Sequence, residues 1–173
     1  GFGAGIKRRT EDLYILNDSF REQVEQYCFG DLEVNMIRFF VYHDLEPEND
    51  NNDPYVLDET QLDWTRYDSD PSNWRTRYVG EALQNAFALS TFGFDHIIGN
   101  SNSAPAWLKT NGQHNNGGTL ISGGESEFSE FLVAFINGMN SRYGVEVTAI
   151  SPTNEPDYEV SYESMNTTPS ELS

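Results

Sequence analysis

The sequence is poor in cysteine, in lysine and in long apolar runs, and each shortage excludes a class of protein. Cys28 is the only cysteine among 173 residues, which excludes an internal disulfide and a zinc site built from several cysteines. No apolar run is long enough to cross a membrane as a helix. Lys7 and Lys109 are the only lysines among 10 basic residues, which face 28 acidic ones, so the net charge is -18. This charge argues against nucleic acid and anionic membranes as partners, because both carry phosphate charge.

The composition that remains suits one folded domain covering residues 1–173. With 37% hydrophobic and 13% aromatic residues, the chain can bury a core. An acidic, lysine-poor surface is a known response to high salt and also occurs in ordinary secreted proteins, so salt adaptation is a hypothesis. Cys28 has helical spacing with Phe20, Val24 and Tyr27, which predicts that this face points inward and that Cys28 is a buried structural thiol rather than a nucleophile.

Apolar periodicity predicts strands that alternate with helices along the whole chain. The predicted strands cover residues 1–5, 36–41, 94–99 and 147–150, and the predicted helices cover residues 19–29, 74–92 and 126–140. Ser19 and Glu22 have the spacing of a capping box at the start of the first helix, and Gly30 is expected to end it. Alternation of this kind, without hairpin signals, implies right-handed crossovers and a mainly parallel sheet.

One carboxylate stands directly after the last predicted strand. Val147–Ile150 is expected to be buried, and polar residues begin where it ends, with Asn154 and Glu155 among them. Pro156 disfavours the α region for Glu155, which predicts an extended backbone there. A carboxyl group at the C-terminal end of a buried strand, in a partly dry site, suits general acid/base chemistry. The alternative is a turn in which these residues only punctuate the backbone.

A charged residue and a long polar connection accompany the second predicted strand. Arg38 interrupts its apolar run and is expected to meet a carboxylate, in a structural salt bridge or in an active-site ion pair. The connection from His43 to Pro71 is rich in Asp, Glu and Asn but lacks the glycine and the spacing of a calcium loop, so no metal is predicted. We expect a solvated loop with aromatic tips at Tyr55, Trp64 and Tyr67.

Four segments of the sequence form a recognisable set of motifs. They are Gly1-Phe-Gly-Ala4, Ile37-Arg38, Ser103-Ala-Pro-Ala-Trp-Leu-Lys-Thr-Asn-Gly112 with Gly117-Gly118-Thr-Leu120, and Ala149-Ile-Ser-Pro-Thr-Asn-Glu-Pro-Asp157 with Tyr162-Glu-Ser164. Together they resemble the glycoside hydrolases of family 30. The resemblance implies an α/β fold, a (β/α)8 TIM barrel, of which only the first four strand–helix units are present, and a secreted enzyme that cuts β-linked glycans without a cofactor.

The resemblance also implies roles for individual residues. Glu155 corresponds to the general acid/base, Asn154 to the residue that binds the hydroxyl beside the reacting carbon, and Arg38 to the residue that orients the nucleophile. Three further residues are assigned to substrate binding: His43, Asn102 and Trp107. For Trp107, stacking on a sugar ring and plain core packing are both open.

The retaining mechanism of the family needs a second carboxylate about 5–5.5 Å from the first. In the family this nucleophile is a glutamate at the end of the seventh strand, and a full barrel takes roughly 250 residues. We therefore interpret residues 1–173 as the N-terminal half of a catalytic barrel. This half is expected to be inactive alone and to need the missing C-terminal half barrel or self-association, because its strand edges are otherwise unpaired.

Two short motifs bear on the substrate. Asn102-Ser103 resembles branches that act on β-1,6-galactan, whereas Asn154 to Tyr158 with Tyr162-Glu-Ser164 is more similar to the xylanase branch, which favours xylan. A carbohydrate-binding or scaffolding protein on a half barrel is the second hypothesis. The third hypothesis is a complete flavodoxin-like domain. Against it, the sequence has no convincing phosphate-binding loop.

Overall fold

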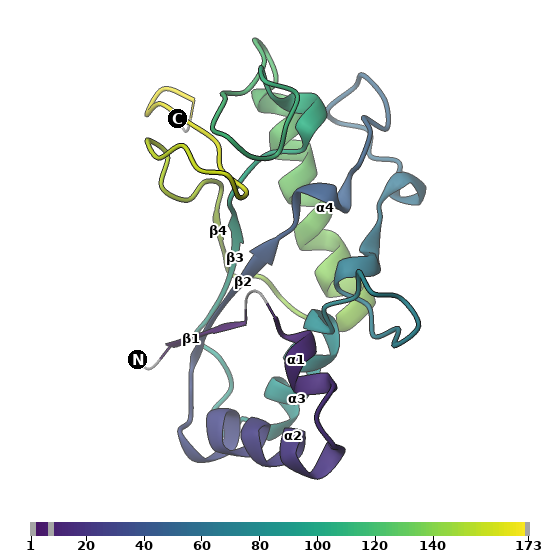
Figure 1. The fold of residues 1–173 in the computed structure, drawn as a ribbon, viewed down its shortest axis with the longest axis vertical. Coiled ribbons are helices and arrows are strands. Elements are labelled where there is room, and N and C mark those ends of the chain that lie inside the picture. The colour runs from purple at the N-terminus through teal and green to yellow at the C-terminus, as the bar shows by residue number, and fades with distance from the viewer. Residues whose placement is uncertain (1–2, 7–8, 172–173) are drawn as a thin grey trace. The chain divides into compact units, whose positions relative to one another are not determined.

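Four strands form one sheet in the computed structural model, which describes residues 3–6 and 9–171 (Figure 1). The sheet has the order β1-β2-β3-β4, and its strands are β1 (Gly3–Ile6), β2 (Met36–Val41), β3 (His96–Ser101) and β4 (Ala149–Ser151). β1 runs parallel to β2, with Gly3 opposite Met36 and Ile6 opposite Phe39. Gly1 and Phe2 of the first predicted strand lie outside the described residues. The parallel pairing of β1 with β2 and the helices between successive strands confirm the predicted parallel α/β sheet.

Helices connect each strand to the next. β1 is followed by α1 (Glu11–Tyr14), α2 (Asp18–Glu25) and a π-helix (Gln26–Asp31), β2 by α3 (Val79–Leu89), and β3 by α4 (Glu125–Tyr143). Short 3-10 helices cover His43–Leu45, Glu59–Gln61, Trp64–Arg66 and Ala106–Leu108. Among the described residues, none of the helices has the length and apolar character needed to span a bilayer.

The chain divides into two compact units. The first consists of residues 1–40, 64–99 and 138–149, and the second of residues 41–63, 100–137 and 150–173. Fully buried side chains of the first include Ile37, Phe39, Leu83, Ile97 and Met139. Those of the second include Leu45, Leu108, Phe131, Phe135 and Met165. The assignment of residues 1–173 to one domain stays a prediction.

The first long helix begins earlier than the sequence pattern suggested. Asn17 is its N-cap, and the Asn17 side-chain oxygen accepts a hydrogen bond from the backbone N–H of Phe20 at 3.0 Å. Asparagine is among the best N-cap residues because its short side chain reaches the free N–H groups of the first turn. The predicted capping box of Ser19 and Glu22 is therefore wrong.

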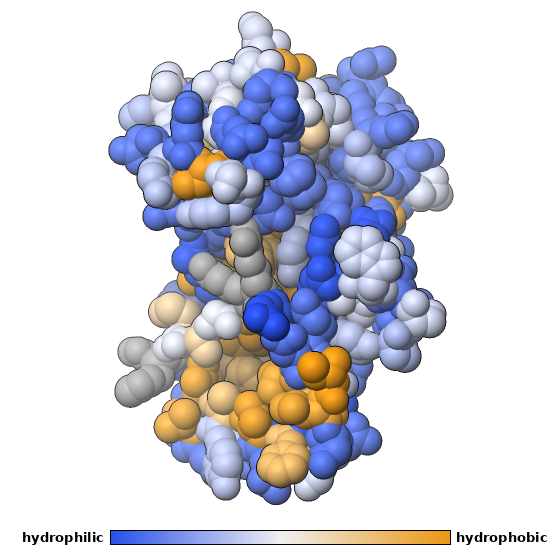
Figure 2. Space-filling view, in the orientation of Figure 1, coloured by the Kyte–Doolittle hydropathy of each residue, from blue (hydrophilic) through white to orange (hydrophobic). Residues whose placement is uncertain are grey.

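The same helix does not end at Gly30, because α2 continues as the π-helix to Asp31. The backbone N–H of Leu32 donates to the carbonyl of Tyr27 at 3.0 Å, a bond that spans five residues. The face that was predicted to point inward is largely exposed, with Phe20 and Tyr27 each 60% exposed. Cys28 is only half-buried rather than buried as predicted. An apolar patch, bordered by hydrophilic side chains, lies over α1 and α2 (Figure 2).

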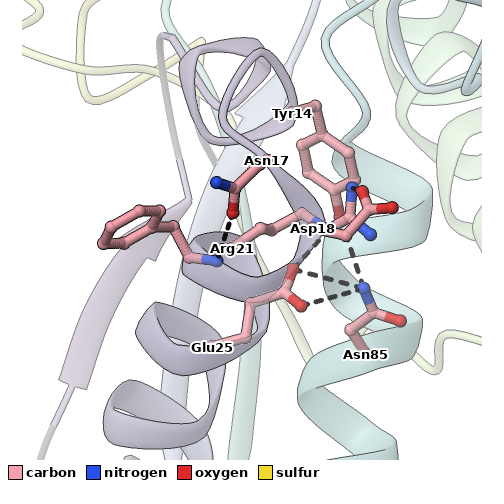
Figure 3. A network of polar contacts seen from close by, with 7 residues as sticks. Tyr14, Asn17, Asp18, Arg21, Glu25 and Asn85 are labelled. Atoms are coloured by element: carbon pink, nitrogen blue, oxygen red, sulfur yellow. Dashed lines mark hydrogen bonds and ion pairs between the residues drawn. The ribbon is translucent and has the colours of Figure 1, made fainter.

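A buried carboxylate joins three helices of the first unit (Figure 3). Glu25 is 4% exposed and accepts hydrogen bonds from the amide of Asn85, at 3.1 and 3.2 Å, and from the hydroxyl of Tyr14 at 3.3 Å. Burial beside Glu25 and Glu81 raises the pKa of Tyr14 far above its usual value. Tyr14 therefore stays protonated, and its hydroxyl serves as a donor for Glu25.

The connection after β2 is less solvated than predicted. Trp64 is 4% and Tyr67 is 0% exposed, and the hydroxyl of Tyr67 donates to the carbonyl of Phe40 at 3.1 Å. A β-carbon at Gly138 would overlap the Trp64 ring, so glycine at this position leaves room for the indole. The predicted aromatic tips are therefore wrong for Trp64 and Tyr67, whereas Tyr55, at 90% exposed, lies on the surface.

The two later helices match their predictions to different degrees. α3 is much shorter than the predicted helix over residues 74–92, because Tyr78 has a left-handed backbone (φ 57°) and Trp74 before it is 81% exposed. α4 extends the predicted helix slightly at both ends and buries Phe128, Phe131 and Phe135 as expected.

Candidate functional site

The second unit is built from three segments that each lie at the C-terminal end of a strand. Residues 41–63 connect to the end of β2, residues 100–137 include the end of β3 with the loop and most of the helix after it, and residues 150–173 include the end of β4 with its loop. In parallel α/β folds, ligands bind where the C-terminal ends of strands pass into loops. Five of the six predicted site residues belong to this unit: His43, Asn102, Trp107, Asn154 and Glu155.

Arg38 is the sixth predicted residue, and it belongs to the first unit. It is half-buried in β2, opposite Gly5 of β1. Its predicted role as a partner of the nucleophile stays a prediction.

The last strand is less buried than expected. β4 covers Ala149–Ser151 rather than residues 147–150, and its residues are exposed or half-buried. β4 neighbours only β3 in the described sheet, so one of its edges has no strand to cover it. The buried strand predicted here is therefore wrong, although the strand itself is present.

Glu155 follows β4 with a backbone that the sequence did not predict. Its φ is 51°, in the left-handed region, whereas Pro156 led us to expect an extended conformation. The carbonyl of Glu155 accepts the N–H of Tyr158 at 3.0 Å, so a local turn fixes the residue. A non-glycine residue in this region is uncommon and often occurs at functional sites.

The side chains of Asn154 and Glu155 lie in contact. The Asn154 Nδ2 donates to the Glu155 Oε2 at 3.1 Å. Glu155 is exposed and Asn154 is half-buried, so the carboxylate is open to solvent rather than in the partly dry site that was predicted. An exposed carboxylate beside an amide can accept a proton and bind a hydroxyl group, both of which a glycan-cleaving site requires.

The segment after β4 is bound to the segment after β3 by backbone hydrogen bonds, and the two lie side by side in Figure 1 (yellow and green). The N–H of Asn116 donates to the carbonyl of Val160 at 2.8 Å, and the N–H of Asn166 to that of Gly118 at 2.8 Å. The Ser164 hydroxyl accepts the N–H of Gly117 at 3.0 Å. The loop that begins with Glu155 is therefore anchored at its far end.

Lys109 adds a buried cation to this anchor. It is 3% exposed, and its Nζ donates to the carbonyl of Ser164 at 2.6 Å. Burial lowers the pKa of Lys109 from 10.5 to about 8, because a charged ammonium loses hydration there. Lys109 belongs to a segment that resembles the family, but no role was predicted for it. Two features of the sequence could have indicated a role for it: lysine is rare in this chain, and Lys109 directly follows Trp107-Leu108.

His43 lies in a group of three side chains, two of which the sequence reasoning left without a role. Its ring stacks on His114 with the ring centres 4.0 Å apart, and its Nε2 lies 3.6 Å from the Glu163 Oε1. The group draws one member from each of the three segments of the second unit. His114 and Glu163 are far apart in sequence, so no local pattern predicts that they meet at His43. That prediction requires knowing how the loops pair.

Trp107 and Asn102 are held by hydrogen bonds within the same unit. The Trp107 indole N–H donates to the carbonyl of Glu46 at 3.0 Å, which ties this half-buried ring to the segment after β2. Asn102 is 8% exposed, and its Oδ1 accepts the amide of buried Asn100 at 2.8 Å. Among residues 3–6 and 9–171, no group of three or more His, Cys, Asp or Glu side chains is placed to hold a metal ion.

Comparison with known proteins agrees with this arrangement. No family model matches the sequence. The catalytic domain of the family 30 xylanase C from Talaromyces cellulolyticus aligns with 97% of the chain at 23% identity and a TM-score of 0.71. The family 30 subfamily 8 xylanase Xyn30A from Clostridium acetobutylicum aligns with 99% of it at 17% identity and a TM-score of 0.70.

A third structure has a different named substrate. The endo-β1,6-glucanase BT3312 aligns with 96% of the chain at 18% identity and a TM-score of 0.72. The chain spans 39%, 36% and 37% of the lengths of these three structures, in the order given. The chain therefore has the fold of the N-terminal part of a glycoside hydrolase family 30 barrel.

Proposed function

We propose that this chain supplies the acid/base half of a retaining endo-β-glycanase, with Glu155 as general acid/base. The observation that carries the proposal is the Asn154–Glu155 pair, in hydrogen-bond contact directly after β4 of a family 30-like fold. In the first step, Glu155 gives its proton to the leaving glycosidic oxygen while a nucleophilic carboxylate attacks the sugar. In the second step, Glu155 takes a proton from the water that releases the sugar.

The other residues have supporting roles in this proposal. Asn154 binds the hydroxyl beside the reacting carbon, Trp107 shapes the cleft, and His43 with Asn102 binds further sugar hydroxyls. Arg38 orients the nucleophile, which the proposal places on the seventh strand of a full barrel. Xylan is the favoured substrate and β-1,6-galactan the next, in a secreted enzyme.

The test compares wild-type protein with Glu155→Gln in the longest reading frame that contains this chain. We expect the substitution to lower hydrolysis of glucuronoxylan roughly 10²- to 10⁴-fold, because the amide cannot transfer a proton. β-1,6-Galactan and β-1,6-glucan serve as the other substrates. Glu146→Gln is the matched control, because it removes an exposed carboxylate just before β4 and should keep full activity.

Rescue of Glu155→Gln by added azide distinguishes a general acid/base from a residue that only binds the substrate. On an aryl xyloside with an activated leaving group, Glu155→Gln should still form the glycosyl-enzyme, because that leaving group needs no proton. Azide needs no general base, so it should restore turnover and yield a glycosyl azide. Equal activity of wild type and Glu155→Gln on xylan would contradict the proposal.

A non-catalytic carbohydrate-binding protein is the second candidate function. The solvent exposure of Glu155 favours it, because a general acid works best where burial raises its pKa. This alternative predicts binding to xylan in wild type and in Glu155→Gln alike, without turnover in either. Affinity electrophoresis in gels with embedded polysaccharide measures that binding.

A further inference from the structure

Four carboxylates gather where the connection after β2 packs on α4, within the second unit. Glu46 and Asp50 come from the connection, and Glu127 and Glu130 come from α4, where they are one turn apart on the same face. Glu46 is 2% and Glu130 is 8% exposed. Three oxygens of the group are buried and accept no hydrogen bond: Asp50 Oδ1, Glu127 Oε2 and Glu130 Oε1.

In the part of the chain that the structure describes, no basic side chain pairs with these carboxylates. The charges that raise the pKa of Glu46 include those of Asp50, Glu130 and Glu127, and the charges that raise the pKa of Glu130 include those of Asp50, Glu127 and Asp53. Buried carboxylates that act on one another resist full ionisation, so Glu46 and Glu130 hold their protons to a higher pH than exposed carboxyl groups do.

The carboxylates lie at a seam between two elements. A groove of about 510 Å³ runs along this seam, and it is lined by the loop residues Pro54, Tyr55 and Leu57 and by Ser129, Glu130 and Val133 of α4. The loop is held at its start by the indole of Trp107, which bonds to the Glu46 carbonyl, and by Asp50, whose N–H donates to the Glu46 Oε1 at 3.3 Å. Glu46 therefore couples the seam to a predicted substrate-binding residue.

We propose that protons held by Glu46 and Glu130 keep the loop of residues 46–58 on α4, so that the loop is closed in acid and opens as the pH rises. When the loop opens, the Glu46 carbonyl is no longer fixed as the acceptor of the Trp107 indole N–H. The segment that begins at His43 then becomes less rigid. The consequence for the candidate site rests on the proposed function, whereas the response of the loop does not.

The direction and the pH window follow from the two buried acids. Burial, with a further contribution from neighbouring carboxylates, raises the pKa of Glu46 and that of Glu130 from 4.5 to about 7. In the open loop both groups return to ordinary values. The closed form is therefore fully favoured below about pH 4.5, and this advantage is lost as the pH rises to about 7.

Amide hydrogen exchange, corrected for the intrinsic pH dependence of exchange, measures this opening directly. In the intact chain we expect protection of the peptides that cover residues 46–58 to fall about tenfold or more between pH 5 and pH 8. Peptides of α3 report on the first unit and should not change. Equal loop protection at the two pH values would overturn the proposal.

Two neutral isosteres test whether these particular protons matter. Glu130→Gln and Glu46→Gln resemble the protonated acids, so each should keep most of the loop protection at pH 8. Glu125→Gln is the matched control, because it removes an exposed charge from the first turn of α4 and should leave the wild-type fall in place. A loop that opens in both isosteres as it does in wild type, or one that the control also closes, would overturn the proposal.

The exchange measurement needs no turnover, so it is independent of the proposed glycanase. If the protein proves inactive on every glycan, the proposed function fails while the loop result stands. If the protein is active but loop protection does not depend on pH, only the proton-held loop fails. Should both hold, we expect the KM of the wild type to increase above about pH 7, and we expect Glu130→Gln to flatten that increase.

Discussion

At the scale of single residues, the burial of Lys109 gives the most specific expectation for how the stability of the fold depends on pH. Its burial costs free energy while it is charged, and the hydrogen bond from its Nζ goes to the Ser164 carbonyl, which carries no full negative charge. Because the pKa of Lys109 is lowered to about 8, the folded protein releases this proton before the unfolded chain does. The contribution of this residue to stability therefore rises as the pH goes from about 8 towards 10.5.

Lys109→Met tests this dependence, because methionine fills similar space without a charge. We expect the unfolding free energy of wild type to gain about 2 kcal/mol relative to the variant between pH 7 and pH 9.5. Urea unfolding of both proteins at each pH gives the difference, in which the titration of the tyrosines cancels. A difference that does not change with pH would mean that Lys109 is not desolvated in the folded state.

Some features of single residues at the candidate site were predictable from the sequence, and others were not. The position of Asn154 and Glu155 in one short turn after a strand end was predictable, because the two residues are adjacent. The left-handed backbone of Glu155 was not, because the preference set by Pro156 is weak against a turn hydrogen bond from Tyr158. Contacts such as His43 with His114 and Glu163 depend on how separate loops pair, and a local pattern carries no information on that pairing.

At the scale of elements, the start of α2 gives a direct contest between two N-caps. The sequence pattern favours Ser19 through a capping box with Glu22, whereas the structure places the accepting side chain at Asn17. The local pattern failed because Ser, Asn and Asp are all good caps and stand together in Asn17-Asp-Ser19, so spacing alone does not choose among them.

Asn17→Ala is expected to lower the free energy of unfolding by about 1 kcal/mol, since the N–H of Phe20 loses its acceptor. Asn17→Asp keeps an accepting oxygen and should cost much less. Ser19→Ala should be nearly neutral, because Ser19 is exposed. Urea unfolding followed by far-UV circular dichroism measures all three variants. A larger loss for Ser19→Ala than for Asn17→Ala would restore the capping box.

At the scale of the whole molecule, apolar surface and net charge act in opposite directions. Ile15 is 80%, Leu32 63% and Phe20 60% exposed, and β1 and β4 each have one neighbour in the described sheet. Exposed apolar side chains and open strand edges both favour association. The net charge of -18 opposes association through repulsion between copies, which salt screens.

We therefore predict that residues 1–173 self-associate and do so more strongly in salt. Sedimentation velocity in about 0.05 M and about 1 M NaCl should show a weight-average sedimentation coefficient that rises with protein concentration, and more steeply at the higher salt, where the Debye length falls to about 3 Å. Phe20→Gln should weaken association, because it removes exposed apolar area from α2. Asn140→Gln is the control on α4, because it changes an exposed polar side chain and removes no apolar area. A monomer at every concentration and salt would mean that repulsion and the covered parts of the sheet suffice to keep copies apart.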